Sequence, residues 1–509
     1  MTFSISCRPP WNAVASGARR RFGAGSLRRL GTARATESAV AASAFAEATA
    51  DRSGFAEATA DRSLCRRTPK DRFVNGAAQA RISGRAQVGR WPRAVLRRCL
   101  ALLALLAALS PCAGQEWTRF RGPNGSGLSA AKTIPALWTE KDINWKAPLP
   151  GPGHSSPVLW GERIFLTTGD VTSNQVWVLC LSAGQGQVLW QRGFPIPAYH
   201  KNGFNTVASG SPAVDEQRVY VCWTTPERFT LAAFEHEGKG VWEKDLGPFI
   251  SQHGGGASLI VLADKVILAN QQDGRSFVLA VDAATGQTRW QTARRTTEAN
   301  YATPCVYDPG DGQPTLVLAS HSHGLSGIDP ASGKVLWELA GVFDKRVVSS
   351  PVMAAGLIIG ACGSGEGGNY LVAARPPNPR AAKPAELAYT IRRAAPYVPT
   401  SLCLGELLFL WGDDGTVSCV QAATGELKWQ ERLGKHYFGS PVCVDGRLFA
   451  VSTSGEVAVV RAADHFELLA RNSLGETTHS TPAVAGGRMY IHAGKHLFSI
   501  GGPPAGPKE

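Results

Sequence analysis

A repeat of 40 to 55 residues constrains this sequence more than any other feature. At six places a small hydroxyl residue followed by Pro opens a short apolar run, and two degenerate copies, Gly256-Ala257-Ser258 and Thr400-Ser401-Leu402, fill the gaps. The six complete copies begin at Ser156, Ser211, Thr303, Ser350, Ser440 and Thr481. Self-similarity at this period is typical of repeat architectures in which each repeat is one supersecondary unit. The sequence therefore predicts eight units.

A second marker, a large residue late in each unit, also counts to eight. Trp fills six of these positions, and Tyr389 and Leu469 fill the other two. The six are Trp145, Trp190, Trp242, Trp290, Trp337 and Trp429. Gly- and Pro-punctuated runs of β-branched and aromatic residues predict strands, and tight-turn sequences such as 282–286 (DAATG) predict hairpins between them. An indole is large and carries one donor, so we expect each Trp to wedge between neighbouring units with its N–H on a backbone acceptor.

Together the two markers predict an all-β, eight-bladed β-propeller of four-stranded antiparallel blades. Trp145 precedes the first unit, and the last unit, from Thr481 to Ile500, has three predicted strands and no Trp. We therefore expect residues 142–147 to supply the outer strand of the final blade, so that an N-terminal strand closes the ring and removes free sheet edges. The propeller is predicted over residues 142–502, after a lead-in segment, 115–141, and before a flexible tail, 503–509.

The net charge of the chain lies in its N-terminal region. Residues 1–114 carry 19 basic and 6 acidic side chains, whereas residues 115–509 carry 34 of each. The region that is predicted to fold is formally neutral, so it gives no support to a nucleic-acid partner.

Residues 90–114 have the layout of a signal peptide or signal anchor. Arginines precede an apolar run from Cys99 to Leu109, and small residues follow it. We expect an exported protein, periplasmic or associated with the cell envelope, that contacts a membrane only through an uncleaved or lipidated N-terminus, with residues 94–110 as the anchor. Residues 1–89 contain two near-identical copies, 43–53 and 53–63, and predict a low-complexity leader that is disordered or a mis-called start.

One unit resembles the repeat of pyrroloquinoline-quinone-like (PQQ-like) propellers. It runs from Asp273-Gly274 through Asp282 and Thr285-Gly286 to Trp290, and a second copy runs from Asp414-Gly415 to Trp429. Residues 117–127 (WTRFRGPNGSG) resemble the start of secreted bacterial members, and the resemblance covers about residues 117–500. The family contains quinoprotein dehydrogenases and also cofactor-free propellers, such as the scaffold lipoprotein of outer-membrane β-barrel assembly. The resemblance therefore implies a fold and leaves the function open.

The cysteines argue against the quinoprotein alternative. In the dehydrogenases, the resemblance implies, a quinone lies in the central funnel between a Trp and a disulfide of adjacent cysteines, with Ca²⁺ held by acidic and amide side chains. This sequence has no Cys-Cys pair and no Cys-x-x-Cys-His haem motif, and its seven cysteines after residue 114 are isolated. We expect no cofactor, no metal site and no catalytic residue, with pyrroloquinoline quinone and Ca²⁺ as the open alternative.

A ring of polar residues just before the unit openers is the candidate site. In a propeller these positions enter the innermost strands and line the central funnel, where they can bind a ligand or a cofactor or merely suit a solvated channel. The candidates are His154, Asn205, His253, Tyr301, Lys345, Arg346, Tyr397, His436, Tyr437 and His479.

These observations predict a noncatalytic binding or assembly scaffold in the cell envelope. We expect a monomer whose partner is an envelope protein or a glycan. Two alternatives stay open, a quinoprotein-like oxidoreductase that binds pyrroloquinoline quinone in the funnel and a carbohydrate-binding propeller.

Overall fold

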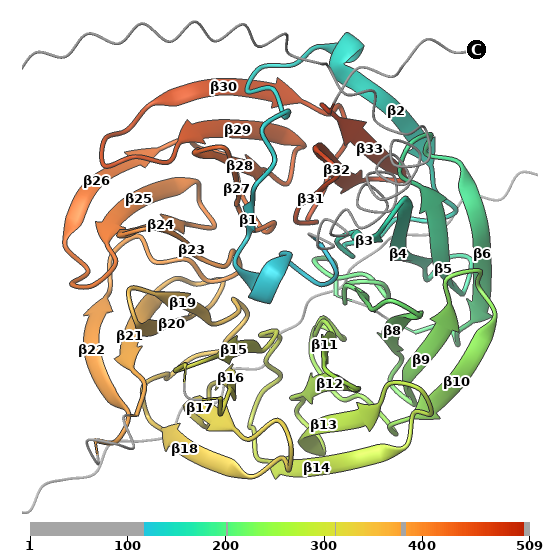
Figure 1. Ribbon diagram of the computed structural model, residues 1–509, viewed down its shortest axis with the longest axis horizontal. Helices are drawn as coiled ribbons and strands as arrows, with labels where there is room; N and C mark the ends of the chain where they lie inside the picture. The colour runs from blue at the N-terminus through green and yellow to red at the C-terminus, as the bar shows by residue number, and fades with distance from the viewer. Residues whose placement is uncertain (1–116, 200–201, 311, 378–382, 503–509) are drawn as a thin grey trace, which may run out of the picture. The chain divides into compact units, whose positions relative to one another are not determined.

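The computed structural model describes residues 117–199, 202–310, 312–377 and 383–502, all of them within the unit Arg90–Glu509. Eight sheets surround a central axis (Figure 1), which confirms the predicted all-β, eight-bladed propeller. Two short 3-10 helices, η1 (Pro123–Gly125) and η2 (Glu140–Asp142), accompany the strands. In these ranges no helix has the length and apolar character needed to cross a membrane. The predicted leader, signal segment and tail lie outside the described residues.

Within each blade the strands follow one another in an antiparallel sheet. Blade one contains β3 (Val158–Trp160), β4 (Arg163–Asp170), β5 (Gln175–Ser182) and β6 (Val188–Pro195); blade two β7 (Ala213–Val214), β8 (Arg218–Thr224), β9 (Phe229–Glu235) and β10 (Gly240–Asp245); blade three β11 (Ile260–Leu262), β12 (Lys265–Asn270), β13 (Ser276–Asp282) and β14 (Thr288–Arg294); and blade four β15 (Cys305–Tyr307), β16 (Thr315–Ser320), β17 (Gly324–Ile328) and β18 (Val335–Leu339).

The other four blades repeat this order. Blade five contains β19 (Val352–Ala354), β20 (Leu357–Cys362), β21 (Tyr370–Arg375) and β22 (Glu386–Ile391); blade six β23 (Leu402–Leu404), β24 (Leu407–Trp411), β25 (Thr416–Gln421) and β26 (Leu427–Arg432); blade seven β27 (Val442–Val444), β28 (Arg447–Val451), β29 (Glu456–Arg461) and β30 (Leu468–Ser473); and blade eight β31 (Ala483–Ala485), β32 (Arg488–Ala493), β33 (His496–Ile500) and β2 (Ile143–Pro148). Blade seven also takes β1 (Leu128–Ser129), which lies parallel to β27.

Burial follows position within the blade. In blade four, every residue of β16 and β17 is buried, whereas the outer strand β18 alternates between exposed and half-buried positions. The middle strands are covered on both faces by neighbouring blades, so they are apolar along their length and not alternating. The hydrophobic core therefore lies between blades, around the ring.

The N-terminal strand closes the ring as predicted. β2 pairs antiparallel with β33, with Lys146 opposite Phe498 and Trp145 opposite Ser499. The observed strand, Ile143–Pro148, differs by one residue at each end from the expected range. Residues more than 340 positions apart in the sequence thus share one blade, so blade eight also has four strands and β33 is not an open sheet edge.

Outer-strand aromatic residues join neighbouring blades through backbone carbonyls. Five of the predicted Trp markers and Tyr389 donate to a carbonyl in the turn of the next blade: Trp145 to Ala183 (3.2 Å), Trp190 to His236 (2.7 Å), Trp242 to Ala283 (3.0 Å), Trp290 to Pro330 (3.0 Å), Tyr389 to Ala422 (2.6 Å) and Trp429 to Ala463 (2.9 Å). Turn glycines fit against these rings; at Gly286, a Cβ atom would lie 2.6 Å from Trp242. The predicted wedge is confirmed at these places.

Around the axis, hydroxyl groups link successive blades. The backbone N–H of one blade's opening residue donates to the hydroxyl of the next blade's opening residue, in seven bonds of 2.9–3.1 Å. The donor and acceptor pairs are Ser156 and Ser211, Ser211 and Ser258, Thr303 and Ser350, Ser350 and Thr400, Thr400 and Ser440, Ser440 and Thr481, and Thr481 and Ser156. We call these eight residues the hydroxyl belt.

The belt corrects the predicted opener of blade three. The equivalent residue there is Ser258 and not Gly256, because β11 begins at Ile260 and each first strand begins two residues after its belt residue. Leu259 stands where six other openers have Pro, so the pattern had no Ser-Pro signal to align on. Gly256 instead lies against the ring of Tyr301.

We predict that Ser440→Ala lowers the free energy of unfolding by about 1–3 kcal/mol, because it leaves the buried N–H of Thr400 without its acceptor. Urea denaturation measures the difference. Ser440→Thr keeps the hydroxyl, as at three natural belt positions, and is the matched control. Equal stability of the Ala and Thr variants would show that the belt does not stabilise the ring.

Candidate functional site

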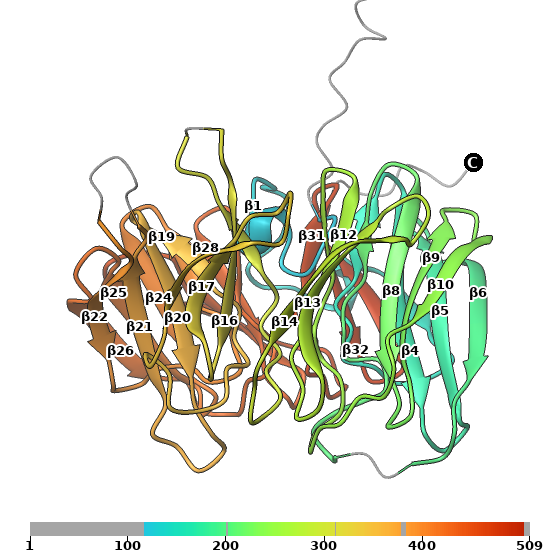
Figure 2. The ribbon, with the colours of Figure 1, turned by 90° about the horizontal axis from the view of Figure 1, so that it is seen from below.

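The segment from Trp117 to Ser129, which we call the plug, closes one end of the propeller axis. Figure 1 shows η1 in the middle of the ring, and Figure 2 shows it at one end of the blades. Its backbone bonds to the inner strands: the Trp117 carbonyl accepts from the N–H of Leu159 (2.9 Å), and the Gly127 carbonyl accepts from the N–H of Cys443 (2.8 Å). Asn124 binds both backbone groups of Val306, at 2.7 and 2.8 Å. Blades one, four and seven are thereby held by a single segment.

Two buried arginines fix the plug. Arg119 donates to the carbonyl of Pro304 (2.6 Å), and Arg121 donates to the carbonyls of Thr400 (2.9 Å) and Pro441 (3.3 Å). Neither guanidinium has a carboxylate within ion-pair distance in the described part of the chain, and burial lowers the pKa of Arg119 to about 10 and that of Arg121 to about 9. Backbone carbonyls, and not an acidic side chain, therefore compensate the buried charge.

Next to the plug, the axis holds a cavity of about 1330 Å³. Phe120 of the plug contributes to its lining, and all eight residues of the hydroxyl belt contribute to its wall. Its volume exceeds the 300–1,000 Å³ of an ordinary small-molecule pocket.

The structure brings nine of the ten candidate residues to this cavity. They are His154, Asn205, His253, Tyr301, Lys345, Arg346, Tyr397, His436 and His479. The structure places these nine residues in the cavity lining, and their role in binding a ligand or cofactor stays a prediction.

Tyr437 departs from the predicted position. Its side chain is completely buried between blades six and seven, where its ring packs edge-on against Trp411 at 5.4 Å. Adjacent residues in an extended segment point to opposite sides, so His436 lines the cavity while Tyr437 enters the core.

One side of the cavity is aromatic and uncharged. The aromatic half consists of His154, Phe204, Phe438 and His479, from the loops that enter blades one, two, seven and eight. Ring centroids lie 5.9 Å apart between Phe204 and Phe438, 4.8 Å between Phe438 and His479, and 4.3 Å between His154 and His479. Burial lowers the pKa of His479, which favours the neutral form of its imidazole.

The opposite side carries charge, much of it already paired. The charged half consists of Glu298, Asp344, Lys345, Arg346, Glu366, Arg392, Asp413 and Asp414. Arg346 lies 3.4 Å from Glu298, and the Lys345 ammonium donates to the Gly367 carbonyl (2.8 Å). The Asp413 carboxylate accepts from the N–H groups of Tyr397 and Val398, and burial raises its pKa to about 6.

The remaining candidates join these two sides. Asn205 donates to the carbonyls of His253 (2.6 Å) and Gly255 (3.0 Å), and the Tyr301 hydroxyl lies 2.9 Å from that of Ser251. Burial lowers the pKa of His253. These bonds within the protein fix the positions of the cavity-lining residues of blades two to four.

Sequence reasoning missed Phe204, Phe438 and the two plug arginines. Phe204 and Phe438 are immediate neighbours of candidates, so a wider window around each opener would have included them. Asp413, which also lines the cavity, is not among the candidates either. Both plug arginines lie in the family-like segment 117–127, but nothing in it predicts their bonds to the blades, because those carbonyls lie 185 to 320 residues away.

The lining does not match the quinone site that the PQQ-like resemblance implies. No Trp and no Cys occur among the described residues that line the cavity. The seven described cysteines are unpaired strand residues, buried except for the half-buried Cys403. A Trp face and a vicinal disulfide are therefore not available here to hold a quinone.

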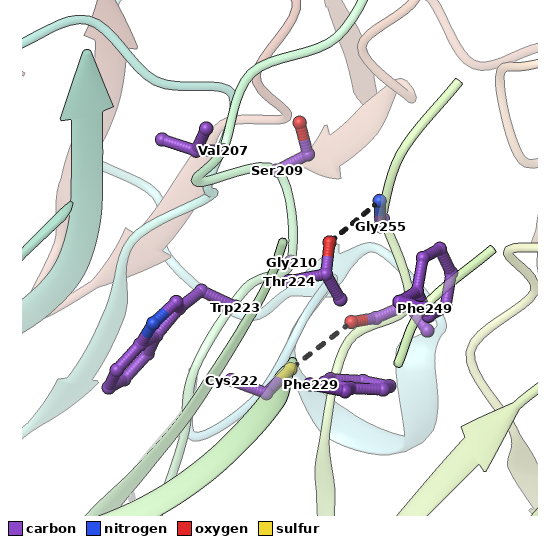
Figure 3. A pocket seen from close by; sticks show the side chains of 11 residues that line it. Val207, Ser209, Gly210, Cys222, Trp223, Thr224, Phe229, Phe249 and Gly255 are labelled. Atoms are coloured by element: carbon purple, nitrogen blue, oxygen red, sulfur yellow. Dashed lines mark hydrogen bonds between the residues drawn. The ribbon is translucent and has the colours of Figure 1, made fainter. Parts of the chain in front are cut away.

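A second cavity, between blades two and three, is too small for a ligand. Its volume is about 10 Å³. Figure 3 shows Cys222, Thr224 and Phe249 among its lining residues. The Cys222 thiol donates to the Ala257 carbonyl, at 3.6 Å. About one water molecule fills such a space.

The fold and the plugged axial cavity define a PQQ-like β-propeller with a polar, ligand-sized centre. The sequence matches the family described as outer membrane protein assembly factor BamB over residues 174–375 and 412–500, more than half of the chain. The chain belongs to this family, which confirms the predicted PQQ-like repeat. None of the curated proteins matches it.

Solved structures share the architecture at low sequence identity. BamB from Moraxella catarrhalis is 15% identical with a TM-score of 0.47, covering 75% of this chain and 100% of that one. The computationally designed Ika8 protein is 10% identical with a TM-score of 0.51, covering 70% and 98%. Quinohemoprotein alcohol dehydrogenase from Comamonas testosteroni is 13% identical with a TM-score of 0.47, covering 79% and 83%. At these identities the likeness concerns the fold alone.

We predict that Arg121→Lys lowers the free energy of unfolding by about 2–4 kcal/mol, because an ammonium cannot reproduce the planar fork that reaches carbonyls of blades six and seven. Denaturant titration measures the loss. Arg432→Lys, at an exposed ion pair with Asp414, is the control and should change stability by less than about 0.5 kcal/mol. Equal effects of the two substitutions would contradict the role of the plug.

A buried histidine beside the aromatic half predicts sensitivity to acid. His492 on β32 is fully buried, and its Nδ1 atom lies 3.1 Å from the Ser155 carbonyl. Its Nε2 atom has no hydrogen-bond partner in the described residues, and burial lowers its pKa to about 4. The unfolded chain takes up this proton near pH 6.5 while the folded chain stays neutral, so stability is full above about pH 6.5 and falls as the pH approaches 4.

We predict that the stability advantage of the wild type over His492→Asn shrinks by about 3 kcal/mol between pH 7 and pH 4. Thermal and urea unfolding across this range measure it. The raised pKa of Asp413 acts with the opposite sign, but it is common to both proteins and cancels in the difference. A difference independent of pH would mean that His492 is not buried in its neutral form.

Proposed function

We propose that this chain is an exported, noncatalytic binding or assembly scaffold of the cell envelope. The observation that carries the proposal is the match of more than half of the chain to a family described as an outer membrane protein assembly factor. An exported location also fits the signal-like residues 90–114.

The geometry of the axis supports a binding role over catalysis. The plug closes one end of the cavity, and the arginine, lysine and buried aspartate of the charged half already bond to other groups of the protein. General acid–base catalysis needs a titratable group free to reach a substrate, and these groups are engaged in holding loops. The partner is an envelope protein or a glycan that meets the cavity or a blade surface, and the scaffold acts as a monomer.

We predict that pyrroloquinoline quinone, with or without Ca²⁺, shows no stoichiometric micromolar binding to the purified protein, because the described residues that line the cavity include neither a Trp nor a Cys. Isothermal titration calorimetry measures this. Micromolar binding that is lost in a His253→Ala, His479→Ala double variant would overturn the scaffold proposal in favour of the oxidoreductase alternative. Reduction of a dye in the presence of substrate, by protein reconstituted with pyrroloquinoline quinone, would likewise favour the oxidoreductase alternative.

A further inference from the structure

The aromatic half of the cavity presents an exposed ring at a polar site. Phe204 is 69% exposed although its edge contacts Phe438. Exposed Phe side chains are unfavourable in water, and an aromatic ring that borders a polar cavity offers a flat apolar face to a ligand. The neighbouring His479 lines the same cavity, and burial, opposed by a hydrogen bond with the backbone of Phe204, lowers its pKa. This half therefore suits a ligand with an uncharged flat face and nearby polar groups.

The charge of the lining disfavours an anion. Five carboxylates, Glu298, Asp344, Glu366, Asp413 and Asp414, oppose three cations, Lys345, Arg346 and Arg392. Two of these cations are engaged, Arg346 by Glu298 and Lys345 by a backbone carbonyl, and the Arg392 guanidinium lies over the ring of Tyr370 at 4.8 Å. The surplus of carboxylates repels an anion, whereas carboxylate oxygens accept hydrogen bonds from neutral hydroxyls.

The wall also disfavours an extended peptide. A peptide that adds to a sheet needs free backbone N–H and C=O groups along an edge. Here the backbone N–H groups of seven belt residues donate to neighbouring hydroxyls, and the plug occupies carbonyls at Pro304, Thr400 and Pro441. The inner strands therefore have few free backbone N–H and C=O groups with which to pair an added peptide strand.

We propose that the axial cavity binds a neutral oligosaccharide. Sugar rings have an apolar face that packs on Phe204 and Phe438, and hydroxyls that bond to the charged half and to His479. A volume of about 1330 Å³ accommodates more than one sugar ring. The proposal deepens the noncatalytic binding role proposed above and rests on it.

Titration calorimetry of the full-length protein with four neutral hexasaccharides, cellohexaose, maltohexaose, xylohexaose and mannohexaose, tests the proposal. We expect at least one to bind with a dissociation constant below about 1 mM, and hexagalacturonate and hexalysine not to bind. Phe204→Ala should weaken the binding at least about tenfold, because it removes the exposed apolar face that a sugar ring would cover. Leu427→Ala, which removes an equally apolar side chain that is 55% exposed on β26, is the matched control and should leave binding unchanged.

The outcomes separate this proposal from the scaffold role. Binding of none of the four sugars, or binding that Phe204→Ala does not affect, overturns the oligosaccharide proposal. Binding of hexalysine alone would assign the cavity to a basic peptide and overturn it as well. If the sugars fail but crosslinking in the envelope of the host identifies a protein partner, the scaffold role stands and only the sugar ligand falls. The scaffold proposal and the oligosaccharide proposal are both overturned only if pyrroloquinoline quinone binds in the calorimetric experiment described above.

Discussion

The hydroxyl belt is the interaction on which the arrangement of the blades depends. Eight inner strands converge on the axis, where their backbone groups lie far from outer solvent and too far apart to pair as a sheet. A Ser or Thr at each opener places one acceptor where the neighbouring blade has an N–H to satisfy. Leaving one such buried N–H unpaired costs about 1–3 kcal/mol, so each bond favours the observed position of its two blades. The bonds also set the angular step from one blade to the next, because each joins two adjacent blades.

The plug provides hydrogen-bond donors for backbone carbonyls that the belt does not pair. Pro follows the belt residue in six blades, and Pro has a carbonyl but no N–H. The inner strands therefore have more carbonyl acceptors than N–H donors where they meet the axis. The guanidinium groups of Arg119 and Arg121, each with five donors, provide hydrogen bonds to these carbonyls. Thr400 takes part in both sets of bonds: its N–H donates to the Ser440 hydroxyl of the belt, and its carbonyl accepts from Arg121 of the plug. Burying two arginines without carboxylates is tolerated because the repeat itself creates a ring of carbonyls.

The parts of the structure that repeat could be predicted from the sequence, and the parts that occur once could not. Trp145 and Tyr389 were recognisable because equivalent residues recur at a fixed place in each unit, and their interblade bonds follow from that place. Ser258 was misplaced by two residues, because Leu259 removed the Ser-Pro signal. Arg121 lies in the family-like segment 117–127, but its role was not predicted, since its partners are up to 320 residues away and no local pattern encodes them. The sequence repeat therefore predicts contacts between adjacent blades, but not the contacts of the plug, which occurs once and bonds to several blades.

The same distinction applies to function. The belt is nearly identical in every blade, so it gives the cavity its shape without making one side differ from another. Specificity must come from the loops between blades, and these differ: those entering blades seven, eight, one and two bring aromatic and imidazole rings, whereas those around blades four to six bring carboxylates and cations. Because ring closure by β2 joins blade eight to blade one, the aromatic residues from both ends of the chain meet as one surface. The closure that stabilises the propeller is therefore also what assembles the uncharged half of its cavity.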